Sequence, residues 1–404
     1  MKVKIEKGFL RGEINAPPSK SMAHRLLICA GLSEGESIIK NVAFSEDILA
    51  TLDCLKAMGA ETVIGEDFVK IKGISPSEIT ESRIFPARES GSTLRFFIPI
   101  ALLSECEHKF TGYGRLPERP MEIYERLCEE KGLHFGRSEG KISVKGKLTA
   151  GDYTLRGDVS SQFVSGLLFA LPLCEGDSRI KLTGKTESRS YIDMTVSAMK
   201  KFGVLSEWED ESTLYIKGSQ KYLGGDYSVE GDCSNSAFLD AFNYLGSEVT
   251  VKGLNESTIQ GDRVYKEYFK RLYEGTPVLD VSDCPDLAPI LMTLACALNG
   301  ATLTGTARLK IKESDRGTVM KEELSEFGAD IEVKENEIII NSSPLHKSNR
   351  LLRGHNDHRV VMSLSVIATL YGGEIEGAEA VRKSYPDFFA RLSELGAVVY
   401  TDDD

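Results

Sequence analysis

Several features are scarce or missing in this chain of 404 residues, and each absence excludes a class of protein. No apolar run reaches the roughly 20 residues that a membrane-spanning helix needs, so no membrane association is expected. Residues 1–6 alternate like a strand and lack the apolar segment of a signal peptide, which favours a cytoplasmic protein. The eight cysteines form no C-x-x-C pair, which argues against both a disulfide framework and a zinc site.

Basic residues are outnumbered, since 49 lysines and arginines stand against 61 aspartates and glutamates, and the net charge is −12. Such a chain is a poor binder of nucleic acid, because phosphate contacts need an excess of Lys and Arg. An anionic ligand would have to bind in a local basic pocket. The apolar share of 41% is typical of a globular protein, and the length allows two domains with substantial cores.

A helix that ends in glycine recurs six times along the chain. Each pattern begins with apolar residues at helical spacing, such as Ile48, Leu52 and Leu55, and ends where a left-handed C-cap belongs. The glycines are Gly59, Gly132, Gly203, Gly275, Gly328 and Gly396. They are about seventy residues apart, except that Gly275 and Gly328 are closer, which predicts a trimmed module after Gly275.

Strand pairs follow several of these helices. Short turn-forming segments separate residues 62–64 from 68–71, residues 133–135 from 142–144, and residues 331–333 from 338–340. Such pairs are typical of β-hairpins. The repeat therefore contains two helices and about four strands, a small α/β module, and six modules predict two globular halves of three.

Two unusual segments mark the crossings between the halves. Residues 16–18 are stiff and extended, because proline fixes φ and restrains the residue before it. Residues 224–226, with two glycines, lie between the third and fourth modules. We therefore expect one domain of residues 1–16 and 227–404 and a second of residues 17–226, with the first strand in the C-terminal half. The acidic tail, residues 402–404, is expected to fray.

A small polar loop precedes the apolar helix of each module, and these junctions carry the chemical signal. A helix N-terminus favours anions, and a Ser, Thr or Asp there is most often only an N-cap. Cations are unusual there, since the helix dipole disfavours them by roughly 0.3–1 kcal/mol. The cations near such starts are Lys20, Arg25, Arg95, Arg119, Lys312, Arg316, Arg359 and Lys383. They predict that several anionic groups bind in one cleft, whereas the fourth module has no cation at its start and would be mainly scaffold.

Two carboxylates stand beside these cations. Asp286 begins a helix predicted over residues 287–298, where an N-cap role would be a sufficient explanation. Glu313 lies between Lys312 and Arg316, where a structural ion pair would be sufficient. Either carboxylate could instead carry general acid–base steps.

Six segments, in order, resemble the 5-enolpyruvylshikimate-3-phosphate synthases of the enolpyruvyl transferase family. They are residues 18–25 (PSKSMAHR), 115–120 (RLPERP), 160–162 (SSQ), 312–316 (KESDR), 356–359 (NDHR) and 383–387 (KSYPD). The resemblance spans nearly the whole chain. It implies an α/β fold of two similar domains, each of three βαβαββ-like repeats in an inside-out α/β barrel. The active site would lie in the interdomain cleft, and the domains would close on shikimate-3-phosphate and phosphoenolpyruvate.

The resemblance also implies a role for each matched residue. Shikimate-3-phosphate would be held by Lys20, Ser21, Arg25, Ser160, Ser161, Gln162, Ser188, Tyr191, Asp286 and Lys312. Phosphoenolpyruvate would be held by Lys20, Gly91, Arg119, Gln162, Arg316, Arg359 and Lys383. The catalytic residues would be Lys20, Asp286 as base toward the 5-hydroxyl, and Glu313 as the group that delivers and later removes the proton at the methylene carbon. The chain departs from the family pattern at Arg308, where many members have Asn.

The implied reaction transfers the enolpyruvyl (carboxyvinyl) group of phosphoenolpyruvate to shikimate-3-phosphate, releases phosphate and serves the shikimate pathway. Addition–elimination through a tetrahedral intermediate needs an acid, a base and anion clamps, so no metal or redox cofactor is expected. The histidines that could be proposed as metal ligands, His24, His355 and His358, have no matching third and fourth ligand at a sensible spacing. We expect a monomer with no partners beyond its two substrates.

Two other interpretations stay open. UDP-N-acetylglucosamine enolpyruvyl transferases share the fold and the donor, but they usually carry a reactive Cys in a mobile loop, and the comparable residues 112–119 contain none. A non-catalytic anion-binding protein could use the same scaffold. The presence of Lys20, Asp286 and Glu313 argues against such a loss of catalysis.

Overall fold

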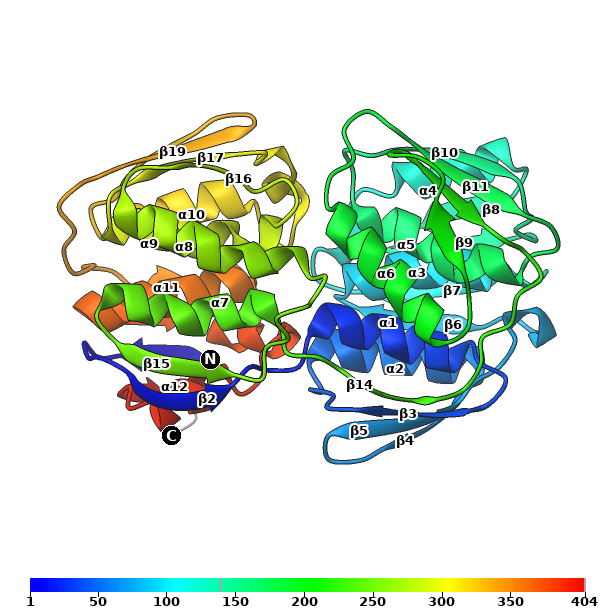
Figure 1. Cartoon of the computed structure of the whole chain (residues 1–404), viewed down its shortest axis with the longest axis horizontal. Helices are drawn as coiled ribbons and strands as arrows, with labels where there is room; N and C mark the ends of the chain where they lie inside the picture. The colour runs from blue at the N-terminus through cyan, green and yellow to red at the C-terminus, as the bar shows by residue number, and fades with distance from the viewer. Residues whose placement is uncertain (139, 403–404) are drawn as a thin grey trace. The chain divides into compact units, whose positions relative to one another are not determined.

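The computed structural model describes residues 1–138 and 140–402, which form two compact units (Figure 1). Unit 1 contains residues 1–19 and those from 231 onward, and unit 2 contains residues 20–230. Residues 17–19 belong to unit 1, where Pro18 forms a bridge with Gly231. Residues 226–228 belong to unit 2, where they pair with a strand. The crossings therefore lie a few residues beyond those expected after residues 16 and 226.

The repeating module is complete in the middle of unit 2. The second module consists of β6 (Ile84–Arg88), α3 (Gly91–Ala101), β7 (His108–Gly112), α4 (Glu122–Glu130), β8 (His134–Ser138) and β9 (Lys141–Lys145). The third consists of β10 (Asp152–Arg156), α5 (Ser161–Ala170), β11 (Ser178–Thr183), α6 (Arg189–Lys201), β12 (Ser206–Trp208) and β13 (Thr213–Ile216). In the second module β6 is parallel to β7, β7 is antiparallel to β9, and β9 is antiparallel to β8. The third module repeats this arrangement.

The first module takes its outer strand from far along the chain. It consists of α1 (Lys20–Gly31), β3 (Glu36–Lys40), α2 (Glu46–Met58), β4 (Glu61–Ile64) and β5 (Phe68–Lys72). The position that β6 and β10 occupy in their sheets is filled by β14 (Asp226–Ser228), which pairs parallel with β3. Unit 2 is thereby completed by a segment just before the chain returns to unit 1.

Unit 1 has one full module and two modified ones. The fifth module is β16 (Val278–Asp280), α9 (Ala288–Ala297), β17 (Ala301–Thr304), α10 (Arg316–Ser325), β18 (Asp330–Val333) and β19 (Glu337–Asn341). The sixth is β20 (Leu352–Arg353), α11 (His358–Tyr371), β21 (Gly373–Glu376), α12 (Phe388–Glu394) and β22 (Val399–Thr401), completed by β1 (Lys2–Ile5). Because β1 pairs antiparallel with both β21 and β22, the prediction that the first strand belongs with the C-terminal half is confirmed.

The fourth module is the trimmed one. It consists of β2 (Arg11–Asn15), α7 (Cys233–Ala241), β15 (Glu248–Lys252) and α8 (Tyr265–Glu274), and its sheet contains only β2 and β15. The chain passes from α8 to β16 without the hairpin that ends the first, second, third and fifth modules. The shortening predicted near Gly275 is therefore present, but the module after Gly275 is complete and the fourth module is the trimmed one. The three predicted hairpins are also confirmed as the antiparallel pairs β4–β5, β8–β9 and β18–β19.

The first helix of each module is almost entirely buried. Ten of the twelve residues of α1 and twelve of the fourteen residues of α11 are buried, whereas only three of the ten residues of α8 are. A helix that is apolar all round belongs inside a core, and each unit has its own cluster of buried apolar side chains. The charged side chains of α1 and α11 lie in the first two turns of these helices.

The glycine caps follow the prediction with one exception. Gly59 ends α2 in the left-handed conformation, with φ of 116°, and donates to the carbonyls of Leu55 and Lys56. Gly275 also ends a helix, but its φ of 173° is ordinary extended backbone, so the left-handed cap predicted there is wrong. The other four, with positive φ, are Gly132, Gly203, Gly328 and Gly396.

Among the described residues, no helix has the length and apolar character needed to cross a bilayer. The eight cysteines, all of them described, form no disulfide. The predicted fraying of the tail is wrong for Asp402, because its carboxylate accepts from the Lys2 N–H at 2.7 Å and its own N–H donates to the Lys2 carbonyl. Residues 403–404 lie outside the described residues.

Candidate active site

Arg316 organises the charged cluster of unit 1. It is the first residue of α10, and its side chain is only 1% exposed. Its guanidinium donates to Asp286 at 2.7 Å, to Glu313 at 2.8 Å and to Asp357 at 2.9 Å. Burial by itself would lower the pKa of Arg316, but the three carboxylates raise it well above the usual value, so the guanidinium stays charged. The ion pair considered for Glu313 is therefore present.

Asp286 lies among three cations. It belongs to the short 3-10 turn Pro285–Leu287 and is not an N-cap, so that explanation is wrong. Besides Arg316, its carboxylate contacts Lys312 Nζ at 3.2 Å and Arg359 Nη2 at 3.5 Å. Burial opposes ionisation, but the cations outweigh it and hold the pKa of Asp286 well below its usual range. Burial also lowers the pKa of Lys312, against the pull of Asp286 and together with Arg316 and Arg308.

Asp357 and Arg359 come from the start of α11. Asp357 caps this helix by accepting from the Arg359 N–H at 2.9 Å, and it also accepts from Ser314 Oγ at 3.0 Å. The guanidinium of Arg359 donates to Asn235 Oδ1 at 3.0 Å. Because Asn235 lies in the first turn of α7, the helix start of the fourth module, expected to be mainly scaffold, contributes a contact to the cluster.

Lys383 and Asp262 complete the surroundings of this cluster. Lys383, at the end of the 3-10 helix Ala378–Lys383, donates to the Asn356 carbonyl at 2.8 Å. Asp262, in the 3-10 helix Gly261–Val264, is buried, and burial followed by the charge of Asp286 raises its pKa to about 7. The sequence interpretation missed Asp262 because, although Arg263 follows it directly, neither residue lies at the start of a module's first helix, where the cations were sought.

In unit 2, Lys20 forms an ion pair that the sequence did not reveal. Lys20 begins α1, and its Nζ lies 2.8 Å from the carboxylate of Asp47 in the first turn of α2. The two side chains are only 14% and 12% exposed. An acidic residue in a first helical turn is ordinarily explained by the helix dipole, which is why Asp47 gave no functional signal.

Gln162, Arg95 and Gly91 lie together at the starts of α5 and α3. Arg95 donates to Gln162 Oε1 at 2.7 Å, and Gln162 Nε2 donates to Ser92 Oγ at 2.8 Å. A Cβ atom on Gly91 would lie 2.4 Å from Arg119 Nη1 and 3.3 Å from Arg95 Nη1. The two arginines therefore converge on Gly91, and the missing side chain provides the room for them.

Arg25 joins α1 to α6. Its guanidinium donates to Thr195 Oγ1 at 2.9 Å, to the Ser21 carbonyl at 2.6 Å and to the Tyr191 carbonyl at 2.8 Å. It also lies 5.4 Å from the ring centroid of Phe96. Burial lowers the pKa of Arg25 to about 10. Folding thus brings Ser21 and Tyr191, both predicted to bind shikimate-3-phosphate, to the same cation, Arg25.

Three of the four predicted serines lie at the starts of α5 and α6 in unit 2. Ser160 caps α5 by accepting from the Gln162 N–H at 3.4 Å, and Ser161 begins that helix. Ser188 precedes α6 in the left-handed conformation, with φ of 55°, and its carbonyl accepts from the Tyr191 N–H at 3.1 Å. The N-cap explanation holds for Ser160, and a capping serine can still donate its hydroxyl to a ligand.

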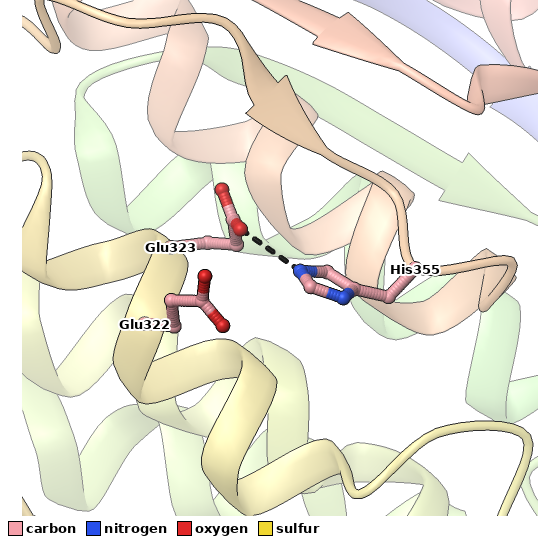
Figure 2. A group of neighbouring side chains, drawn as sticks. All are labelled: Glu322, Glu323 and His355. Carbon is pink, nitrogen blue, oxygen red and sulfur yellow. Dashed lines mark hydrogen bonds and ion pairs between the residues drawn. The ribbon is translucent and has the colours of Figure 1, made fainter.

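Among the described residues, one group of side chains has the spacing of metal ligands: Glu322, Glu323 and His355 (Figure 2). His355 Nε2 lies 2.8 Å from Glu323 Oε1. Both carboxylates already form ion pairs with Arg350, whose Nη2 lies 3.3 Å from Glu323 and 4.0 Å from Glu322. The group is therefore an ion-pair network and does not fit a metal.

The comparisons with known proteins agree on one family. The family model described as EPSP synthase (3-phosphoshikimate 1-carboxyvinyltransferase) matches residues 5–392. The 3-phosphoshikimate 1-carboxyvinyltransferases of Clostridium kluyveri and Clostridium novyi are 41% and 40% identical to this chain, and each comparison covers 98% of both proteins. An EPSP synthase structure from Acinetobacter baumannii is 23% identical, covers 99% of this chain and 100% of its own, and has a TM-score of 0.80.

The likeness to that solved structure confirms the predicted two-domain α/β fold. Neither of the two alternative interpretations is supported by these matches. The chain therefore belongs to the EPSP synthase (3-phosphoshikimate 1-carboxyvinyltransferase) family.

Proposed function

We propose that the clusters of unit 1 and unit 2 together carry out the family's reaction. In it, the carboxyvinyl group of phosphoenolpyruvate passes to the 5-hydroxyl of shikimate-3-phosphate, and phosphate is released. The observation that carries this proposal is Asp286, a carboxylate kept ionised among Lys312, Arg316 and Arg359. Such a group can both orient a hydroxyl and receive its proton.

Shikimate-3-phosphate would bind mainly to unit 2. The residues proposed to hold it are Lys20, Ser21, Arg25, Ser160, Ser161, Gln162, Ser188 and Tyr191 of unit 2 and Asp286 and Lys312 of unit 1. The start of α5 supports a phosphate site, since the positive end of the helix and the hydroxyls of Ser160 and Ser161 meet there.

Phosphoenolpyruvate would bind to cations of both units. The residues proposed to hold it are Lys20, Gly91, Arg119 and Gln162 of unit 2 and Arg316, Arg359 and Lys383 of unit 1. The convergence of Arg119 and Arg95 on Gly91 supports an anion site at the start of α3. Lys20 lies beside Asp47, which would hold the ammonium group in place for both substrates.

The acid–base steps would be divided between Glu313 and Asp286. Glu313, protonated at this stage, gives a proton to the methylene carbon of phosphoenolpyruvate, and the 5-hydroxyl oxygen bonds to the adjacent carbon as its proton passes to Asp286. The carbon–oxygen bond to phosphate then breaks, and the phosphate leaves with the bonding electrons and takes up the proton held by Asp286. Glu313 takes a proton back from the methyl group, which restores the double bond. The cations near both groups stabilise the anionic substrates throughout.

The charges of the cluster make Asp286 a base only when substrate is present. Without anionic ligands, Lys312, Arg316 and Arg359 hold the pKa of Asp286 low. When the phosphate and carboxylate of phosphoenolpyruvate engage Arg316 and Arg359, the pull of these cations on Asp286 weakens, and its pKa rises. Proton transfer is thereby coupled to binding.

We also propose that the protein acts in the cytoplasm as a monomer, on these two small molecules alone. Eight cysteines without a disulfide support a reducing compartment. Sedimentation at micromolar concentration tests the oligomeric state, and a dimer would contradict it.

Release of phosphate from shikimate-3-phosphate plus phosphoenolpyruvate tests the proposed function directly. We expect turnover with this pair, and loss of most activity in Lys20→Ala and Asp286→Ala while both variants stay folded by circular dichroism. Near-normal rates in either variant would remove the role assigned to that residue. Turnover with UDP-N-acetylglucosamine in place of shikimate-3-phosphate, or binding without turnover, would overturn the proposal.

A further inference from the structure

We propose that Glu323 and His355 form a positioning pair that holds the loop between β20 and α11, and so sets the affinity for phosphoenolpyruvate. Neither residue is expected to touch a substrate. The inference rests on the binding role proposed above for Arg359 and Lys383, which this loop places.

The backbone of this loop has a conformation that its surroundings must stabilise. His355 and Asn356 have φ of 49° and 52°, the one consecutive pair of left-handed non-glycine residues in the described chain. A side chain disfavours this conformation, which persists only where the surroundings impose it. Asp357 and Arg359 follow directly, so any relaxation of the loop would move both.

Glu323 supplies that restraint. Its side chain is 0% exposed, and its two oxygens accept from the Arg353 N–H at 3.1 Å and from His355 Nε2 at 2.8 Å. Figure 2 shows the bond to His355. Burial would raise the pKa of Glu323, but His355, the Arg353 N–H and Arg350 together lower it. Because an ionised carboxylate can only accept, Nε2 of His355 must be the donor, which fixes the orientation of the ring.

One helix therefore holds the loop on both sides. Arg316 at the start of α10 binds Asp357 after the loop, and Glu323, about two turns later, binds Arg353 and His355 before and within it. Between these points the Asn356 carbonyl accepts from Lys383. The same frame thus places Arg359 and Lys383, two of the cations proposed to bind phosphoenolpyruvate.

The neighbouring Glu322 provides a matched control. It is adjacent in α10 and belongs to the same group of possible ligands, but it is exposed, and its carboxylate pairs with Arg350 at 4.0 Å instead of bonding to the loop. Removing its charge should leave the loop in place. If the group instead held a divalent metal, Glu322 and Glu323 would matter alike.

The test measures KM for each substrate and kcat in Glu323→Ala, Glu323→Gln, His355→Ala and Glu322→Gln. We expect Glu323→Ala to raise the KM for phosphoenolpyruvate roughly tenfold, the scale of a slightly misplaced binding group, with the KM for shikimate-3-phosphate changed less than twofold. Glu323→Gln should raise the KM for phosphoenolpyruvate less than Glu323→Ala does, since the amide oxygen of the glutamine still accepts from His355. His355→Ala should resemble Glu323→Gln, and Glu322→Gln should match wild type.

Three outcomes would overturn the inference. The first is an unchanged KM for phosphoenolpyruvate in the folded Glu323 and His355 variants. The second is an equal rise of both KM values, which is the mark of general destabilisation. The third is a Glu322→Gln effect equal to that of Glu323→Gln and reproduced by a chelator, which would indicate a metal. If Glu323→Ala does not fold, the KM values of Glu323→Gln and His355→Ala test the inference in its place.

Arg359→Ala separates this inference from the proposed function. An unchanged KM for phosphoenolpyruvate in Arg359→Ala would mean that the proposed binding role is wrong. A raised KM in Arg359→Ala, with normal values in the Glu323 and His355 variants, would mean that only the positioning role is wrong.

Discussion

Replacing Asp357 by alanine should destabilise unit 1 far more than the loss of a helix cap. The side chain of Asp357 is 0% exposed, and it accepts from Arg316 Nε at 2.9 Å, Arg316 Nη2 at 3.3 Å, Ser314 Oγ at 3.0 Å and the Arg359 N–H at 2.9 Å. The cluster has three cations and three carboxylates, so the substitution leaves one positive charge uncompensated in a buried place.

The magnitude follows from the two contributions that Asp357 makes. Breaking a buried ion pair from one side costs about 3–5 kcal/mol of unfolding free energy. A lost N-cap adds about 1 kcal/mol. Since each kcal/mol lowers the midpoint of a domain of this size by about 2–4 °C, we expect Asp357→Ala to melt about 8–24 °C below wild type.

The assay is thermal unfolding at pH 7.5, followed by circular dichroism, with Asp315→Ala as the matched control. Asp315 also caps a helix, α10, by accepting from the Thr318 N–H at 3.2 Å, but that bond is exposed. Its loss should cost only about 1 kcal/mol. If the two variants melt at the same temperature, the buried charge network does not stabilise unit 1 as argued.

Three more predictions concern other parts of the two clusters. Gly91→Ala places a methyl group 2.4 Å from Arg119 Nη1 and should raise the KM for phosphoenolpyruvate selectively; steady-state kinetics identical to wild type would contradict the convergence on Gly91. Burial raises the pKa of Asp262 to about 7, whereas the pKa of an unfolded Asp is about 3.9. The protonated carboxyl group therefore contributes fully to the free energy of unfolding below about pH 4, and this contribution is lost as the pH rises through about 7. Asp262→Asn should therefore gain melting temperature over wild type, more at pH 8 than at pH 5, and a gain independent of pH would refute the shifted pKa. Lys20→Met and Asp47→Asn should couple by about 0.5–3 kcal/mol in a double-mutant cycle of unfolding free energies, because their charges lie 2.8 Å apart and are mostly buried; additive effects would show that the pair contributes nothing.

Local features of the fold were predictable because neighbouring residues determine them. The hairpins β4–β5, β8–β9 and β18–β19 follow from short turns between β-rich runs. The helix starts at Ser160 and Asp357 follow from side chains that cap the next turn. Gly275 shows where such reasoning fails, because a glycine permits the left-handed conformation without requiring it.

Distant pairings needed the tertiary structure. The strand β14 completes a sheet of unit 2 although it lies beside unit 1 in the sequence, because the free edge of β3 is available to it. Asp47, Asn235 and Asp262 carry no local signal, and they matter because folding brings them to Lys20, Arg359 and Asp286. A sequence does not show whether a short polar side chain faces water or a buried charge.

The sequence by itself determined the modular α/β architecture, a shortening of the repeat near Gly275, the membership of the first strand and the identity of the cations at the helix starts. Only the tertiary structure decided which carboxylate each cation meets, and which of them are buried. The physical reason is that periodicity and capping depend on residues a few positions apart, whereas the strength of a charge interaction depends on distance and on exclusion of water. Arg316 illustrates the difference: its place at a helix start is visible in the sequence, but its three buried carboxylate partners are properties of the fold.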